Sequence, residues 1–79
     1  MDNIEKFLRK LSFDKRQTVK NVLIKILSDK TQGLDVKKLK GYTHLFRVRM
    51  GGVRIVFFQD KTTRILFIGK RGDSKYEQF

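Results

Sequence analysis

Apolar residues recur at every second position between Phe46 and Phe57, on both sides of Gly51-Gly52. Alternation with a period of two predicts β-strands, and two glycines between such runs predict a hairpin with a two-residue turn. The turn fixes which residues face each other across the two strands. On one face every predicted pair is apolar: Met50 with Val53, Val48 with Ile55, and Phe46 with Phe57. We expect this face to lie in the core.

The other face of the same hairpin is strongly basic. The predicted register places Arg49 directly opposite Arg54, and Arg47 lies two residues along the same face. Like charges that face each other directly destabilise a sheet. We therefore expect an anionic group to be bound at this face.

The chain before the hairpin has helical periodicity. Apolar residues recur at helical spacing from Ile4 to Leu11 and predict a short helix. Ser12 is suited to cap a second helix, which we expect to end between Ser28 and Lys30. The apolar stripe of this second helix consists of Val19, Val22, Leu23, Ile26 and Leu27.

After the second helix the pattern becomes irregular. We interpret the segment from Leu34 to Lys40 as a basic connector. A turn at Gln59 to Thr62 leads into a further strand, from Thr63 to Ile68. Helices that precede an antiparallel meander are typical of an α+β fold. The sequence thus predicts one domain over residues 1–79, in which an N-terminal helical hairpin packs on a small antiparallel β-sheet and leaves the arginine-bearing face open.

Charge and composition narrow the function. The 19 Lys and Arg against 8 Asp and Glu give a formal net charge of +11 at pH 7. This excess favours a polyanionic partner, and nucleic acid fits better than a membrane surface because the apolar faces are needed for the core. With no Cys and 1 His, we expect neither a metal site nor a cofactor. No signal peptide or membrane-spanning apolar run is apparent, so we expect a cytoplasmic protein.

Four short segments follow one another in the second half of the chain. They are Leu39-Lys40-Gly41, Phe46-Arg47-Val48-Arg49, Val53-Arg54-Ile55-Val56-Phe57 and Ile68-Gly69-Lys70-Arg71, and Tyr76 follows them. This ordered set resembles the RelE/ParE toxin superfamily of bacterial toxin–antitoxin systems. The resemblance implies the toxin component of a type II system. Family members usually begin with a β-strand that this chain lacks, so we expect one open edge of the sheet.

Members of the RelE branch are ribosome-dependent endoribonucleases that cut messenger RNA in the A site and are inhibited by a cognate antitoxin. The resemblance therefore implies three partners, which are messenger RNA, the ribosome and an antitoxin. The positive charge of the chain indicates that an acidic antitoxin segment lies across the arginine-bearing face. We expect no membrane and no metal ion to take part.

The resemblance also implies site residues. The catalytic residues are then Arg49, Arg54, Arg71 and Tyr76, and the RNA-binding candidates are Arg47, Lys70, Lys40 and His44. Without metal, the RNA 2′-hydroxyl attacks its neighbouring phosphate, and arginines suit the resulting negative charge because their planar donor fork matches two phosphate oxygens. In this scheme Arg71 protonates or stabilises the leaving 5′-oxygen, and Tyr76 stacks on a base or orients the sugar.

The general base is not settled by the sequence. Arginine stays protonated near neutral pH and accepts a proton poorly. Lys70 and His44 are the nearest titratable alternatives, and positioning of the 2′-hydroxyl by ribosomal RNA is a third.

Two other functions stay open. The ParE branch of the superfamily contains inhibitors of DNA gyrase, which generally lack the clustered arginine and tyrosine set. A basic RNA-binding module without catalysis would carry a similar charge. The complete arginine set favours the nuclease.

Overall fold

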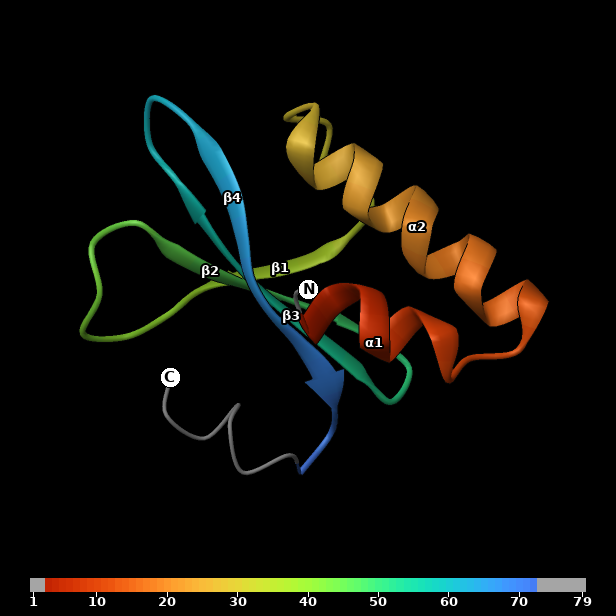
Figure 1. The fold of residues 1–79 in the computed structure, drawn as a ribbon. Coiled ribbons are helices and arrows are strands. Elements are labelled where there is room, and N and C mark those ends of the chain that lie inside the picture. The colour runs from red at the N-terminus through yellow and green to blue at the C-terminus, as the bar shows by residue number, and fades with distance from the viewer. Residues whose placement is uncertain (1–2, 73–79) are drawn as a thin grey trace.

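The computed structural model describes residues 3–72, which form two helices and four strands. Their bounds are α1 Asn3–Arg9, α2 Phe13–Leu27, β1 Asp35–Lys38, β2 Leu45–Met50, β3 Val53–Gln59 and β4 Thr63–Lys70. The strands form one antiparallel sheet in the order β1-β2-β3-β4. Both helices lie on one side of this sheet (Figure 1), so the described residues have the expected α+β architecture.

The second helix begins and ends where the sequence predicts. The side chain of Ser12 accepts a hydrogen bond from the backbone N–H of Lys15 at 3.4 Å, as expected of an N-cap. After Leu27, the backbone N–H of Ser28 donates to the carbonyl of Ile24 at 2.9 Å. The apolar stripe is narrower than expected, because Leu27 is 54% exposed. Neither helix of residues 3–72 has the length and hydropathy to cross a bilayer.

The predicted register of the β2–β3 hairpin is confirmed. Met50 faces Val53, Val48 faces Ile55, Phe46 faces Phe57, and Arg49 faces Arg54. Gly51 has a φ of 57°, in the left-handed region that favours glycine, and this explains why the turn between the strands needs a glycine at that position.

The core lies between the helices and the apolar side of the hairpin. Val48, Ile55 and Phe57 are at most 1% exposed and pack against the buried stripe of α2. The rings of Phe46 and Phe57 stack with their centroids 5.5 Å apart. Helix α1 adds partly buried side chains to this cluster, including Phe7. The apolar face of the hairpin therefore forms the sheet side of the core, as expected.

The interpretation of residues 34–40 as a connector is wrong for its central part. These residues include strand β1, which pairs with β2 so that Val36 faces Val48. The backbone N–H of Leu39 continues the pairing with a hydrogen bond to the carbonyl of Leu45 at 2.9 Å. The two strands are neighbours in the chain, joined by the loop at 39–44, and only the short apolar alternation of Leu34 and Val36 marks β1 in the sequence. As a result the sheet has four strands where the sequence predicted three.

The last strand is longer than expected and irregular. Strand β4 continues to Lys70, and its pairing with β3 shifts by one residue between Val56 and Phe57. Because of this bulge, Ile65 and Ile68 both face the helices although they are three positions apart. Lys70 faces Val53 and therefore also lies on the side of the helices.

Candidate functional site

The sheet side that faces away from the helices carries most of the charged residues of the strands, and we call it the arginine face. By register its charged members are Asp35, Lys37, Arg47, Arg49, Arg54 and Arg64. Val56 and Phe67 lie on the same side and are buried. These two apolar residues separate the end of the face near the β2–β3 turn from the end near the β1–β2 loop.

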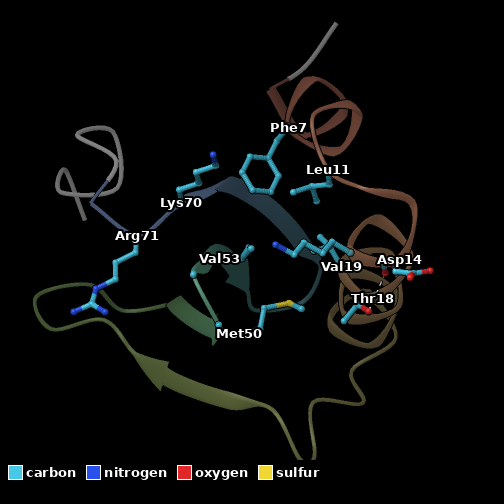
Figure 2. A pocket seen from close by; sticks show the side chains of 12 residues that line it. Phe7, Leu11, Asp14, Thr18, Val19, Met50, Val53, Lys70 and Arg71 are labelled. Atoms are coloured by element: carbon cyan, nitrogen blue, oxygen red, sulfur yellow. Dashed lines mark hydrogen bonds between the residues drawn. The ribbon is translucent and has the colours of Figure 1, made fainter.

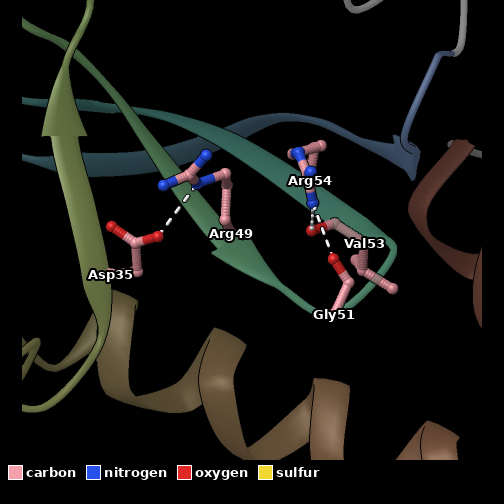
Figure 3. A network of polar contacts seen from close by, with 5 residues as sticks. All are labelled: Asp35, Arg49, Gly51, Val53 and Arg54. Atoms are coloured by element: carbon pink, nitrogen blue, oxygen red, sulfur yellow. Dashed lines mark hydrogen bonds and ion pairs between the residues drawn. The ribbon is translucent and has the colours of Figure 1, made fainter.

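Arg49 has a carboxylate partner within the chain. Its Nε donates to Oδ2 of Asp35 at 2.9 Å, and the two side chains are 49% and 52% exposed (Figure 3). Asp35 is the only acidic residue in the four described strands. Strand β1 therefore supplies one carboxylate beside Arg49, and a bound anion beside Arg49 and Arg54 stays a prediction.

Arg54 is held differently. Its Nη1 donates to the carbonyl of Gly51 at 2.8 Å and to that of Val53 at 3.0 Å. The guanidinium group thus turns back toward the β2–β3 turn, whereas that of Arg49 turns toward β1 (Figure 3). Because each of the two facing arginines has its own acceptor, the sheet tolerates their direct opposition.

Arg47 lies between the other strands of this face. It faces Lys37 of β1 on one side and Val56 of β3 on the other, and it is half-buried. Its Nε is buried and makes no hydrogen bond with the described residues 3–72. A buried donor without an acceptor is uncommon, so packing rather than hydrogen bonding at Nε holds this arginine.

Arg71 lies beside the β2–β3 turn, just after the end of β4. Its backbone N–H donates to the carbonyl of Gly52 at 2.7 Å, which fixes the chain beside the same turn that holds Arg54. Figure 2 shows its side chain directed away from Phe7. The structure therefore brings three of the predicted catalytic residues to one end of the molecule: Arg49, Arg54 and Arg71. Tyr76, the fourth, lies outside the described residues.

Lys70 lies on the side of the helices, whereas Arg49 and Arg54 lie on the other side of the sheet. Together with Arg71, it lines a groove of about 720 Å³ between the helices, the β2–β3 turn and the end of β4 (Figure 2). The walls of this groove are mostly apolar and include Phe7, Leu11, Val19, Met50 and Val53. The structure thus places Lys70 on the side of the helices, and not beside Arg49 and Arg54.

Lys40 and His44 lie in the β1–β2 loop, at the far end of the hairpin from its turn. Lys40 is exposed in a turn closed by a hydrogen bond from the N–H of Tyr42 to the carbonyl of Leu39 at 3.3 Å. His44 precedes Arg49 by five positions, about 16 Å along a strand. The structure therefore brings neither Lys70 nor His44, the two titratable candidates for the general base, to the facing arginines.

His44 belongs instead to a small aromatic group at this loop end. Its ring meets the ring of Phe58 edge-on, with the centroids 5.7 Å apart, and its Nε2 lies 3.9 Å from Oδ2 of Asp60. The guanidinium carbon of Arg64 lies 6.0 Å from the Phe58 ring centroid. Phe58 is thus contacted by side chains of its own chain, which accounts for its half-buried state.

Asp35 is the functional candidate that the sequence reading missed. It lies in a segment interpreted as a connector, although Leu34 and Val36 on either side of it give a short apolar alternation. That alternation was the available signal. Within residues 3–72, no three His, Asp or Glu side chains gather in a group able to hold a metal ion.

Comparison with known proteins agrees with this architecture. No protein-family model matches the chain, and no curated protein matches it. Among solved structures, the chain is similar to the crystal structure of the RelB–RelE antitoxin–toxin complex from Methanococcus jannaschii, with a TM-score of 0.72 and 26% sequence identity. The similarity covers 94% of this chain and 89% of that chain. The protein therefore has a RelE-like fold, as the resemblance in sequence implied.

Proposed function

We propose that the protein is the toxin component of a type II toxin–antitoxin system and that it cleaves messenger RNA in the ribosomal A site, in the cytoplasm and without a metal ion. The observation that carries the proposal is the gathering of Arg49, Arg54 and Arg71 around the β2–β3 turn. The similarity to a RelB–RelE complex supports the toxin–antitoxin assignment.

The chemistry suits arginines whose orientation is set in advance. When the 2′-hydroxyl of RNA attacks the adjacent phosphate, negative charge develops on the phosphate oxygens and on the leaving 5′-oxygen. Arg49 and Arg54 neutralise the phosphate, and Arg71 beside the β2–β3 turn stabilises the leaving oxygen. Both facing guanidinium groups are already held by acceptors of the chain, so less reorganisation is needed when RNA binds.

In this proposal the ribosome aligns the RNA for in-line attack, because neither predicted general base lies close to the facing arginines. The alternative bases Lys70 and His44 lie away from the facing arginines, so the isolated protein has little to enforce in-line attack. A message held in the A site would have its 2′-hydroxyl aligned by the surrounding RNA, and alignment alone accounts for a large part of many rate enhancements. The protein then contributes mainly electrostatic stabilisation.

The decisive experiment is primer extension on a short message with and without programmed ribosomes. We expect cuts within A-site codons that leave a 2′,3′-cyclic phosphate or its hydrolysed form. Free RNA should stay almost intact, and EDTA added to the ribosome-free reaction should make no difference. Equal cleavage of free and ribosome-bound message would refute ribosome dependence. No cleavage in either setting, with tight binding of RNA or of gyrase instead, would favour the binding module or the gyrase inhibitor.

The partner in this proposal is an antitoxin with an acidic segment that covers the arginine face. The formal net charge of +11 favours fast association with such a segment. The association rate should therefore fall clearly between low and physiological salt concentrations. An association rate that does not depend on ionic strength would contradict this electrostatic account.

A further inference from the structure

We propose that Asp35 is a positioning residue of the arginine face, which holds Arg49 by its Nε and leaves the outer guanidinium nitrogens for an RNA phosphate. This inference rests on the proposed RNA cleavage and deepens it. The observation behind it is the hydrogen bond of 2.9 Å between Arg49 Nε and Asp35 Oδ2. Among residues 3–72, this is the hydrogen bond that orients the Arg49 side chain.

The strand register places the two residues of this ion pair directly opposite each other. Asp35 of β1 faces Arg49 of β2, which faces Arg54 of β3, so three charged residues form one row across three strands. Neighbouring strands lie about 4.8 Å apart, and in this proposal the phosphate lies over the row beside Arg49, on the side of Arg54. Asp35 is attached at the far side of Arg49 from this position. It therefore orients the arginine without occupying the place of the phosphate.

The mode of contact matters as much as the distance. A guanidinium group that is bound through Nε keeps the donors of its two outer nitrogens, and these are the donors that bind phosphate in a forked manner. Arg54, by contrast, uses Nη1 for the carbonyls of Gly51 and Val53. Of the facing pair, Arg49 is thus the arginine better prepared to grip a phosphate through both outer nitrogens.

A carboxylate at this place has two opposite effects. Its negative charge repels RNA phosphate and weakens binding in the ground state. Its hydrogen bond keeps Arg49 in the orientation that the transition state needs, and errors of about 1 Å in such an orientation can reduce a rate about a hundredfold. Removal of the Asp35 charge should therefore strengthen RNA binding while it slows cleavage. A residue that merely relieved repulsion between Arg49 and Arg54 would change stability and would not separate binding from rate.

The test compares two substitutions at Asp35 with a matched control. Asp35→Asn keeps a side-chain acceptor for Arg49 and loses the charge, and Asp35→Ala loses both. The control is Glu5→Gln, because Glu5 accepts a hydrogen bond from Arg9 at the same 2.9 Å in an exposed ion pair on α1. Thermal unfolding of each variant first establishes that it is folded. The cleavage rate at saturating ribosomes and the affinity for a short RNA are then measured separately.

We expect Asp35→Ala to lower the cleavage rate by about 10- to 100-fold and Asp35→Asn by less, while both bind RNA about threefold more tightly. Glu5→Gln should stay within about twofold of the wild type in both measurements. In the background of Arg49→Ala, Asp35→Ala should cause no further loss, because a positioning residue acts only through the residue it positions.

Three results would overturn the inference. The first is a wild-type cleavage rate in Asp35→Ala. The second is a change of RNA affinity and cleavage rate in the same direction. The third is that Asp35→Ala lowers the cleavage rate as much in the Arg49→Ala background as in the wild type. The last result would mean that Asp35 acts on RNA directly. If the wild-type protein itself cuts no message on ribosomes, the proposed function fails and this inference fails with it. If the wild type cuts and the Asp35 variants cut equally well, the inference alone fails.

Discussion

The two faces of the β2–β3 hairpin share one backbone but are held by different forces. On the side of the helices, Val48, Ile55 and Phe57 have almost no exposed surface, and burial of apolar area stabilises them. On the arginine face, an ion pair and the carbonyls around the turn orient Arg49 and Arg54. Adjacent residues of one strand can therefore be changed to test stability and function separately.

At the middle of the sheet the arginine face also contains buried apolar residues. Val56 lies on the arginine face and is nevertheless fully buried, between Arg47 on one side and Phe67 on the other. The arginine face thus contains an apolar centre that contributes to stability. Its charged turn end and its aromatic loop end lie on either side of this centre.

The largest effect on stability should come from the side of the helices. Phe57→Ala removes a large side chain that is 1% exposed and stacks on Phe46. We expect the free energy of unfolding to fall by about 3–5 kcal/mol, since truncation of a buried aromatic ring also leaves a cavity. Urea-induced unfolding followed by circular dichroism measures this. A loss below about 1 kcal/mol would show that the core does not depend on this ring.

On the arginine face the effect should fall on activity. Arg54→Ala and Arg49→Ala should each reduce ribosomal cleavage by about a hundredfold or more, because each removes charge that stabilises the developing phosphate anion. The free energy of unfolding should change by only a few tenths of a kcal/mol, since exposed ion pairs contribute little and the repulsion between the two arginines disappears. Paired measurements of primer extension and thermal unfolding check both statements. A double alanine variant that still arrests growth at matched expression would contradict the site.

The apolar centre of the arginine face allows a finer test. Val56→Ala removes two carbon atoms from a site without exposed surface, so we expect a loss of about 1.5 kcal/mol in the free energy of unfolding. Cleavage by the folded variant should stay close to that of the wild type. An unchanged free energy of unfolding would mean that the apolar centre of the arginine face does not contribute to stability.

The smallest effect should come from Lys70, because it lies on the side of the helices and faces Val53. We expect Lys70→Ala to change the cleavage rate by less than about threefold. The matched control is Lys37→Ala, which removes a lysine from the arginine face beside Arg47 and should weaken RNA binding more. A larger loss in Lys70→Ala than in Lys37→Ala, measured by binding and primer extension, would reverse the assignment of the two faces.

The hairpin and the second helix could be predicted from the sequence because local rules determine them. The spacing of apolar residues around Gly51-Gly52 determines that Arg49 faces Arg54. A register shifted by one residue would have placed arginine side chains in the core. Ser12 marked the start of α2 for a similarly local reason, since its side chain caps the first turn.

The features that were missed depend on pairing between neighbouring strands whose own sequence patterns are short or irregular. Strand β1 has only four residues and is stabilised by β2, so its pairing and the role of Asp35 become visible only in the folded sheet. The bulge in β4 is a second example. Uninterrupted alternation from Ile65 would place Lys70 on the arginine face, whereas one extra residue moves it to the other side.

The turn at Gly51-Gly52 is an unfavourable site for insertions. Tips of hairpins are common choices for inserted tags, labels or permuted termini because they usually tolerate change. Here the carbonyl of Gly51 accepts from Arg54 and that of Gly52 accepts from the backbone of Arg71. An insertion would displace the acceptors of both arginines, so we expect it to reduce the proposed cleavage more than it reduces stability. The loop around Lys61 is the safer place for a label.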